Sequence, residues 1–284
     1  MDSSMTAKMC LFVNAYHSEC ANIHIINNTY AHSMLGKDYD IIYKFLEEGI
    51  SFFDPFYNGD DKVLHIVNKV IGPSVLGRSA WLEDKIKVEE KLGLKQYLIL
   101  ASGYDTSGLN HQNLNVFEVD RSDVIDDKLR RLKNIKSNVK YIRSDLKNNF
   151  EEKIINEGFD KNKKTLVSLL GLSYYLEKEE FLNLLERILK IVNEGSVILF
   201  DYPNNIVDEE KIKLKSLAAE SKEEMKTNYD AKEFIPTLER NNAYICEDLT
   251  NKEIDKYFYD YNTINIKEPI HAQKSVNYMM IVKK

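Results

Sequence analysis

The 284-residue sequence has few of the features that mark secreted, membrane or metal-binding proteins. It contains only three cysteines, Cys10, Cys20 and Cys246, and their odd number and wide spacing favour a reducing compartment over a disulfide framework or a zinc site. No apolar run approaches the ~20 residues of a membrane helix, and the first residues lack the apolar core of a signal peptide. We therefore expect a cytoplasmic protein with no membrane partner.

Positive charge is not in excess either. The 39 lysines and arginines are outnumbered by 45 aspartates and glutamates, which gives a formal net charge of −6. A nucleic-acid surface normally needs a basic patch, so we expect no nucleic-acid partner. The six histidines share no metal-ligand spacing, so we assign no metal. The length fits one large domain or one domain with an appended cap, and the sequence leaves the oligomeric state open.

The chain changes its pattern near residue 90. Residues 1–90 have a helical pattern without a strong strand signal, and Gly72-Pro73 is predicted to separate helices at 62–70 and 78–91. From Gln96 onward, short apolar runs alternate with helical segments. Repeated βα units of this kind specify a parallel sheet with right-handed crossovers. The predicted strands are 96–100, 115–120, 139–143, 165–170 and 197–200.

The last 80 or so residues leave this rhythm. A long charged helix is predicted at 208–225 and an irregular segment at 227–238, followed by a strand, a helix and a final strand at 276–282. This ending fits a Rossmann-like α/β fold with a seven-stranded sheet whose last strand is antiparallel. We therefore predict an N-terminal helical cap at 1–90 and an α/β domain at 91–284, with an insertion after strand five at about 206–240.

The stretch from Gln96 to Asp120 has the order expected of a nucleoside site. An apolar strand ends in the small residues Ala101-Ser102-Gly103, and a second strand ends in Asp120. Small residues let a ligand approach the backbone, and an acid roughly 20 residues further on can accept hydrogen bonds from both ribose hydroxyls. The alternative is an empty turn with Asp120 as a helix N-cap. The conjunction of the two features favours the nucleoside site.

Together with further motifs, this stretch resembles class I S-adenosylmethionine-dependent methyltransferases of the leucine carboxyl methyltransferase family. That family includes bacterial members similar to tetracenomycin-type polyketide O-methyltransferases. The resemblance covers about residues 8–205 and implies the seven-stranded methyltransferase sheet and S-adenosylmethionine as cofactor. It rests on Leu100–Thr106 against LGAGxDT, Phe117–Asp120 against xxEVD, Ser144–Leu146 against xDL, Tyr174–Leu176 with Glu180 against YL…E, and Arg78 ahead of the first strand.

The resemblance assigns a role to each matching residue. Arg78 holds the carboxylate of the cofactor's amino-acid tail as a bidentate fork. The other implied contacts are Asp120 with the ribose, Asp145 with the adenine amino group, Leu146 with the adenine ring, Gly103 with the closely approaching ligand, and Asp105 with the loop or the tail amine. Each also has a purely structural alternative: a helix-capping arginine, an N-cap or a turn acid.

Three positions depart from the family pattern. Ala101 replaces the first glycine of the cofactor loop, Leu170 replaces an acid after strand four, and Asn14 replaces an N-terminal basic residue. The first change keeps a small side chain. The other two remove polar contacts to the cofactor, which leaves a cofactor-binding protein without catalysis as one alternative.

The nature of the methyl acceptor decides whether a general base is needed. A carboxylate is ionised at pH 7, whereas a phenol with a pKa near 10 would benefit from a base. His17, beside Tyr16, is the candidate base, with ordinary packing as its alternative. Tyr174, Tyr175 and Tyr202 follow strand ends and are predicted to shape the acceptor pocket together with Tyr16, with Tyr175 positioning the acceptor.

We therefore expect an O-methyltransferase that acts on a carboxylate of a small molecule or of a peptide end. Two other enzyme activities remain open: methylation of a phenol or hydroxyl group in secondary metabolism, and NAD-linked oxidoreduction. The sequence lacks the G-x-G-x-x-G motif that would favour the second of these.

Overall fold

A seven-stranded mixed sheet forms the centre of the molecule. The computed structural model describes residues 5–133, 135–220 and 224–284. The strand order is β3-β2-β1-β4-β5-β7-β6, with β1 to β5 parallel and β7 antiparallel to both of its neighbours. This confirms the predicted α/β sheet and its antiparallel last strand. The strands are β1 (Gln96–Leu100), β2 (Asn115–Asp120), β3 (Lys140–Arg143), β4 (Thr165–Leu169), β5 (Val197–Pro203), β6 (Ala243–Leu249) and β7 (Val276–Lys283).

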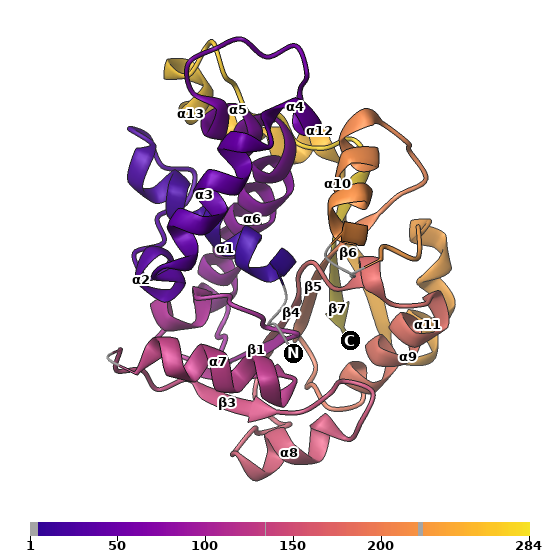
Figure 1. Ribbon diagram of the computed structural model, residues 1–284. Helices are drawn as coiled ribbons and strands as arrows, with labels where there is room; N and C mark the ends of the chain where they lie inside the picture. The colour runs from indigo at the N-terminus through magenta and orange to yellow at the C-terminus, as the bar shows by residue number, and fades with distance from the viewer. Residues whose placement is uncertain (1–4, 134, 221–223) are drawn as a thin grey trace.

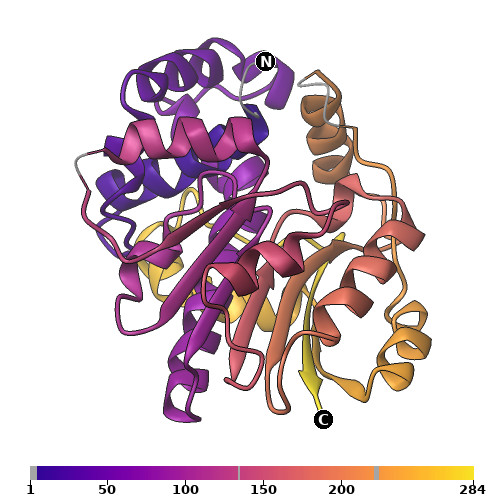
Figure 2. The ribbon, with the colours of Figure 1, turned by 90° about the horizontal axis from the view of Figure 1, so that it is seen from below.

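Alternate residues of the central strands point to opposite faces of the sheet, and both faces are covered by helices (Figure 2). In β1, Tyr97 and Ile99 join one hydrophobic cluster, whereas Leu98 and Leu100 join the other. This double burial explains the continuous apolar runs in the sequence. The first face is covered by α6 (Gly72–Lys91) and α7 (Ser122–Leu132), and the second by α8 (Phe150–Asn156), α9 (Lys178–Leu189) and α11 (Ile235–Arg240).

The N-terminal helices pack over the same face as α6 and share its hydrophobic cluster. Phe12 and Leu46 are fully buried in that cluster together with Trp81 of α6. Figure 1 shows these helices, in indigo and violet, along one side of the molecule. They are α1 (Met5–Cys20), α2 (Ala31–Leu35), α3 (Asp38–Glu48), α4 (Ile50–Phe53) and α5 (Lys62–Ile66). A helical N-terminal region was predicted, and the domain boundary near residue 90 stays a prediction.

The predicted break at Gly72-Pro73 is wrong. A π-helical segment, η1 (Val67–Ile71), continues from α5 directly into α6, and Pro73 lies in the first turn of α6. Proline is tolerated there because the first N–H groups of a helix have no intrahelical partner. A Cβ on Gly72 would come within 2.4 Å of the Val67 carbonyl oxygen, so only glycine allows this junction. π-helical turns are frequent at functional sites, and Ile71 lines the cavity described below.

The C-terminal third is more helical than predicted. The charged helix α10 ends at Glu220, and residues 221–223 lie outside the described part of the chain. The segment predicted to be irregular contains α11, which covers the sheet with the buried Leu238. No helix among the described residues is long and apolar enough to cross a membrane. The remaining elements are α10 (Glu209–Glu220), η2 (Ser107–Asn110), η3 (Ser173–Tyr175), η4 (Ala231–Glu233), α12 (Asn251–Ile254), η5 (Asp255–Phe258) and α13 (Tyr259–Ile264).

Candidate active site

A cavity of about 1700 Å³ lies at the carboxyl ends of the parallel strands. Residues of α1, α6 and α10 line it. In Figure 1, α1 and α6 lie on the left of the sheet and α10 lies on the right. Parallel α/β sheets bind ligands at this edge. Because small-molecule sites typically measure about 300–1,000 Å³, this cavity has room for two ligands at once.

The loop after β1 is held in a left-handed conformation by Asp120. Ala101 has φ 52° and Gly103 has φ 49°. The Asp120 carboxylate accepts from the Gly103 N–H at 2.7 Å with Oδ2 and from the Arg121 N–H at 2.7 Å with Oδ1. Burial raises the pKa of Asp120, and these two backbone donors oppose that shift. Each carboxylate oxygen keeps further acceptor capacity, and Asp120 lines the cavity, so it can still accept from ligand hydroxyls.

A buried ion pair supports the same loop from below. Lys128 of α7 and Glu118 of β2 are both fully buried and paired, and the Lys128 ammonium also donates to the Asp105 carbonyl oxygen. The Asp105 side chain accepts from the Ser107 N–H at 2.8 Å and from the Ser107 hydroxyl at 2.9 Å. Asp105 therefore orders the loop. Glu118 lies inside the Phe117–Asp120 motif, yet nothing in the sequence pointed to this structural role.

Arg78 lines the cavity from α6 and is held by a carboxylate that sequence analysis missed. Its Nη1 lies 3.5 Å from Oδ2 of the fully buried Asp201, and its Nη2 lies 3.2 Å from Cys10 Sγ. Asp201 also accepts from the Gly171 N–H at 2.6 Å and from the Tyr174 hydroxyl at 2.9 Å. Burial, and next the charge of Asp201, raise the pKa of Tyr174, so its hydroxyl stays protonated as a donor. The available signal was an acid at the end of the fifth strand.

Glycine is required beside this arginine. Gly171 has φ 71°, and a Cβ at this position would come within 2.8 Å of Arg78 Nη1. Leu170, which stands where the family has an acid, lines the cavity. The charge partner of the Arg78 guanidinium is Asp201 on β5.

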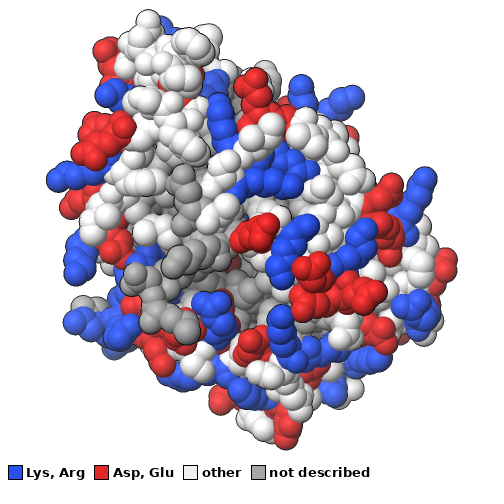
Figure 3. Space-filling view, turned by 45° about the vertical axis from the view of Figure 1, so that its right-hand side comes forward, with Lys and Arg blue, Asp and Glu red and all other residues white. Residues whose placement is uncertain are grey.

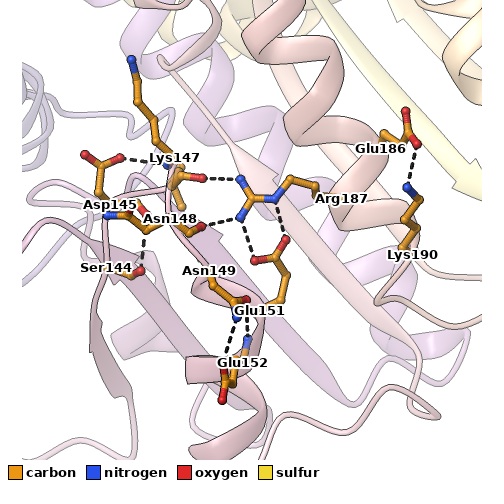
Figure 4. Close-up of polar contacts among 11 residues, drawn as sticks. Ser144, Asp145, Lys147, Asn148, Asn149, Glu151, Glu152, Glu186, Arg187 and Lys190 are labelled. Atoms are coloured by element: carbon orange, nitrogen blue, oxygen red, sulfur yellow. Dashed lines mark hydrogen bonds and ion pairs between the residues drawn. The ribbon is translucent and has the colours of Figure 1, made fainter.

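Asp145 and Leu146 line the cavity after β3 on a loop that Arg187 of α9 ties down. The Arg187 guanidinium donates to the carbonyl oxygens of Leu146 and Asn148 and forms an ion pair with Glu151 at 2.6 Å (Figure 4). Two backbone carbonyls and one carboxylate thus converge on one side chain, which suits the planar fork of arginine. Nothing in the sequence marks Arg187, because it lies in an ordinary amphipathic helix.

The structure does not bring His17 and Tyr16 to the cavity. His17 is 3% exposed, and its Nε2 accepts the Ile25 N–H at 2.9 Å. Burial lowers the pKa of His17 to about 4. The Tyr16 hydroxyl lies 3.4 Å from the Asp61 carboxylate. The face of α1 that lines the cavity carries Cys10 and Asn14 instead. Tyr16 and His17 follow Asn14 by only two and three positions, but the helical period places their side chains on other faces of α1.

Tyr202 also lies elsewhere. Successive residues of a strand face opposite sides, and Tyr202 joins the cluster beneath α9 and α11. Its hydroxyl donates to Asp248 at 2.7 Å. Of the four tyrosines predicted for the acceptor pocket, Tyr174 and Tyr175 line the cavity, and the prediction is wrong for Tyr16 and Tyr202.

Asn14 lines the cavity with an unsatisfied polar atom. Its Oδ1 is buried and has no hydrogen-bond partner within the described residues. A buried acceptor without a donor is unusual in a folded protein, and it suits a ligand that brings an N–H group.

Within residues 5–133, 135–220 and 224–284 there is no group of three or more histidine, cysteine, aspartate or glutamate residues that could hold a metal ion. On the face shown in Figure 3, acidic and basic side chains are interspersed.

The order of the strands, with Asp120 at the end of β2 beside the left-handed loop after β1, is that of the class I methyltransferase fold. Solved structures share it: a DUF574 family protein of Streptomyces avermitilis has TM-score 0.63 and 14% identity, over 90% of this chain and 95% of that one. A candidate methyltransferase of Thermobifida fusca has TM-score 0.59 and 14% identity, over 99% and 96%. Magnesium protoporphyrin IX methyltransferase of Synechocystis, solved with bound SAH, has TM-score 0.50 and 10% identity, over 86% and 99%.

The chain belongs to the leucine carboxyl methyltransferase family, which residues 7–189 match. YktD of Bacillus subtilis, named as a candidate S-adenosyl-L-methionine-dependent methyltransferase, is 31% identical over 305 aligned positions, covering all of this chain and 99% of YktD. A Mycobacterium tuberculosis protein with the same kind of name is 29% identical over 69% of this chain and 60% of its own length. The protein is thus an S-adenosylmethionine-dependent methyltransferase. The alternative of an NAD-linked oxidoreductase is wrong.

Proposed function

We propose that the protein transfers a methyl group from S-adenosylmethionine to a carboxylate oxygen of a small molecule. The observation that carries the carboxylate is the placement of His17. His17, the one base candidate predicted from the sequence, lies outside the cavity, and its Nε2 already accepts the Ile25 N–H. A carboxylate acceptor is ionised at pH 7 and needs no base. The cavity volume of about 1700 Å³ favours a small molecule that enters beside the cofactor.

The residues around the cavity fit S-adenosylmethionine. Arg78 is proposed to hold the tail carboxylate, and the unpartnered Oδ1 of Asn14 to accept from the tail ammonium group. Asn14 lies one turn along α1 from Cys10, which contacts Arg78. Asp120 is proposed to accept from the ribose hydroxyls, and Asp145 from the adenine amino group. When bound, the cofactor supplies an electrophilic methyl group.

The chain contributes binding, orientation and exclusion of water. Methyl transfer to an ionised oxygen is a direct displacement, so a fixed geometry of the two reactants supplies much of the rate. The Asp201 network fixes Arg78, the Lys128–Glu118 pair fixes the loop after β1, and Arg187 fixes the adenine loop. Tyr175 on η3 is proposed to position the acceptor.

Single-turnover methyl transfer from labelled cofactor to a panel of carboxylic acids and phenols tests the proposal. Carboxylic acids are expected to yield methyl esters, with a rate nearly flat from about pH 6 to 8. Methylation of phenols alone, with a rate that rises through about pH 6.5, would overturn it. In that case the base to examine is His24, which lines the cavity; His24→Gln would remove the rising limb.

A further inference from the structure

A second buried acceptor without a partner lines the cavity at Gln273, on the segment that leads into β7. Gln273 is 2% exposed, and its Nε2 donates to the Val70 carbonyl oxygen at 3.0 Å. A carbonyl oxygen only accepts, so this bond fixes which end of the amide is which. The Oε1 atom is then left buried with no partner among the residues that the structure describes. A ligand with a hydrogen-bond donor would satisfy it.

A buried cation lies at the same end of the cavity. Lys211 is 5% exposed and lines the cavity, and its ammonium group donates to the carbonyl oxygens of Asn204 and Ile206 at 2.5 and 3.0 Å. An ammonium group has three N–H donors, and the described residues take two of them. Asp208 Oδ1 accepts from the Lys211 backbone N–H at 2.8 Å and lies 3.4 Å from the Ser275 hydroxyl. Ser275 lies two positions after Gln273 and also lines the cavity, so these contacts join the Lys211 segment to the Gln273 segment, and we treat the two as one cluster.

This cluster and Arg78 lie at different levels of the cavity wall. Val70, which binds Gln273, precedes Arg78 by eight positions in the continuous η1 and α6 helix, which corresponds to about 12 Å along the helix axis. Ile71, Ser74 and Val75 line the cavity between the two levels. The family match ends at residue 189, so the cluster belongs to the part of the chain beyond it. Its position fits the far end of the methyl acceptor.

The chemistry of the cluster selects a group that both accepts and donates. A second carboxylate would satisfy Lys211 and leave the Gln273 oxygen without a donor, and an amine would do the reverse. A carboxamide accepts through its oxygen and donates through its nitrogen. We propose that the methyl acceptor carries a carboxamide at its end remote from the methylated carboxylate, held by Lys211 and Gln273. This rests on the proposed function.

Calorimetry on the protein loaded with S-adenosylhomocysteine tests the proposal without requiring turnover. The probes are azelaic acid monoamide and decanoic acid. Their chains have the same number of non-hydrogen atoms when the amide nitrogen is counted, and the first ends in an amide whereas the second ends in a methyl group. The monoamide is expected to bind at least about tenfold more tightly to the native protein. In Gln273→Leu and Lys211→Met the two probes should bind within about twofold of each other. Lys213→Met, on the same helix, is the matched control and should keep the preference.

Equal binding of the two probes by the native protein, binding of neither, or a preference that survives both substitutions would overturn the carboxamide. If Lys211→Met does not fold, Gln273→Leu alone decides, because it removes only the acceptor. Binding of S-adenosylmethionine and ester formation by the native protein are measured separately. A protein that makes methyl esters without preferring the amide would refute this inference and leave the proposed function standing.

Discussion

The two halves of the cavity differ in how many of their polar groups the protein itself satisfies. In the proposed cofactor half, formed by Asn14, Arg78, the loop 101–105, Asp120 and the 145–148 loop, the charged groups of Arg78 and Asp120 already have protein partners, and the Asn14 Oδ1 is the exception. In the proposed acceptor half, formed by Lys211, Gln273 and Ser275, the buried Gln273 Oε1 has no donor among the residues that the structure describes. A preorganised site loses little on binding its ligand, whereas an unsatisfied group rewards only a ligand that completes it. We therefore propose that the first half holds one fixed ligand and that the second discriminates among acceptors.

Asp201→Asn is expected to have the largest effect on the cofactor half. The change leaves the Arg78 guanidinium without its buried counter-charge, and breaking a buried pair by removing one partner costs about 3–5 kcal/mol. We expect a large drop in the free energy of unfolding in urea and weaker binding of S-adenosylmethionine in calorimetry. Asp248→Asn is the control, because Asp248 binds a tyrosine hydroxyl outside the cavity. Equal effects of the two changes would show that Asp201 does not serve the cofactor.

Asp120→Ala is expected to weaken cofactor binding by about 3 kcal/mol, roughly a hundredfold. The change would remove the two charge-assisted hydrogen bonds that we propose Asp120 accepts from the ribose, each about 1.5–3 kcal/mol, and it also frees the Gly103 N–H. Titration calorimetry with S-adenosylmethionine measures the loss. Asp123→Ala, in the first turn of the following helix, is the control and should bind as the native protein does. Unchanged affinity in Asp120→Ala would remove Asp120 from the site.

The cofactor half was predictable from the sequence because its residues lie in short motifs next to strand ends. Ala101, Gly103, Asp120 and Asp145 were identified in this way, and all of them line the cavity. The direction of a single side chain was harder to predict. Tyr202 was assigned to the pocket, yet its neighbour on the strand, Asp201, points toward Arg78. A period of two turns adjacent residues to opposite faces, and the apolar run of β5 gave no alternation from which to choose.

The acceptor half was not predictable, because contacts between distant segments create it. Gln273 contacts Val70 across 203 positions of the chain, and Ser275 contacts Asp208, which precedes Lys211, across 67 positions. No local motif records such a pairing. The same limit explains the wrong break at Gly72-Pro73: two residues that usually interrupt helices are accommodated by the π-helical turn that precedes them.

Acidification is expected to loosen the wall of the cavity through His17. The unfolded chain titrates near pH 6.5, whereas burial lowers the pKa of folded His17 to about 4. Between these values only the unfolded chain binds the proton, so stability falls as the pH is lowered from about 6.5 to 4, by about 3 kcal/mol in total. Protonation also takes the Nε2 acceptor from the Ile25 N–H, and Ile25 lines the cavity.

Urea unfolding at pH 7 and pH 4.5 of the native protein and of His17→Gln measures this contribution. The difference between the two pH values should shrink in the variant, and His271→Gln, at an exposed position, should leave it unchanged. The variant should also keep its methyl-transfer rate at pH 7. A large loss of rate in His17→Gln, with cofactor affinity unchanged, would instead indicate that His17 acts on the methyl acceptor during the reaction.

Ala101→Gly is expected to have the smallest effect, a stabilisation of about 1 kcal/mol. Ala101 has φ 52°, and a left-handed backbone costs an ordinary residue about 1–2 kcal/mol, which glycine avoids at the expense of greater freedom in the unfolded chain. Asn242, with φ 50° and outside the cavity, is the control; because asparagine tolerates this conformation, Asn242→Gly should stabilise less. Thermal and urea unfolding measure both.

Since the loop already has the conformation that glycine would adopt, the affinity of Ala101→Gly for the cofactor should stay within about threefold of the native value. A loss of stability in Ala101→Gly would mean that the alanine methyl group contributes packing that outweighs the strain.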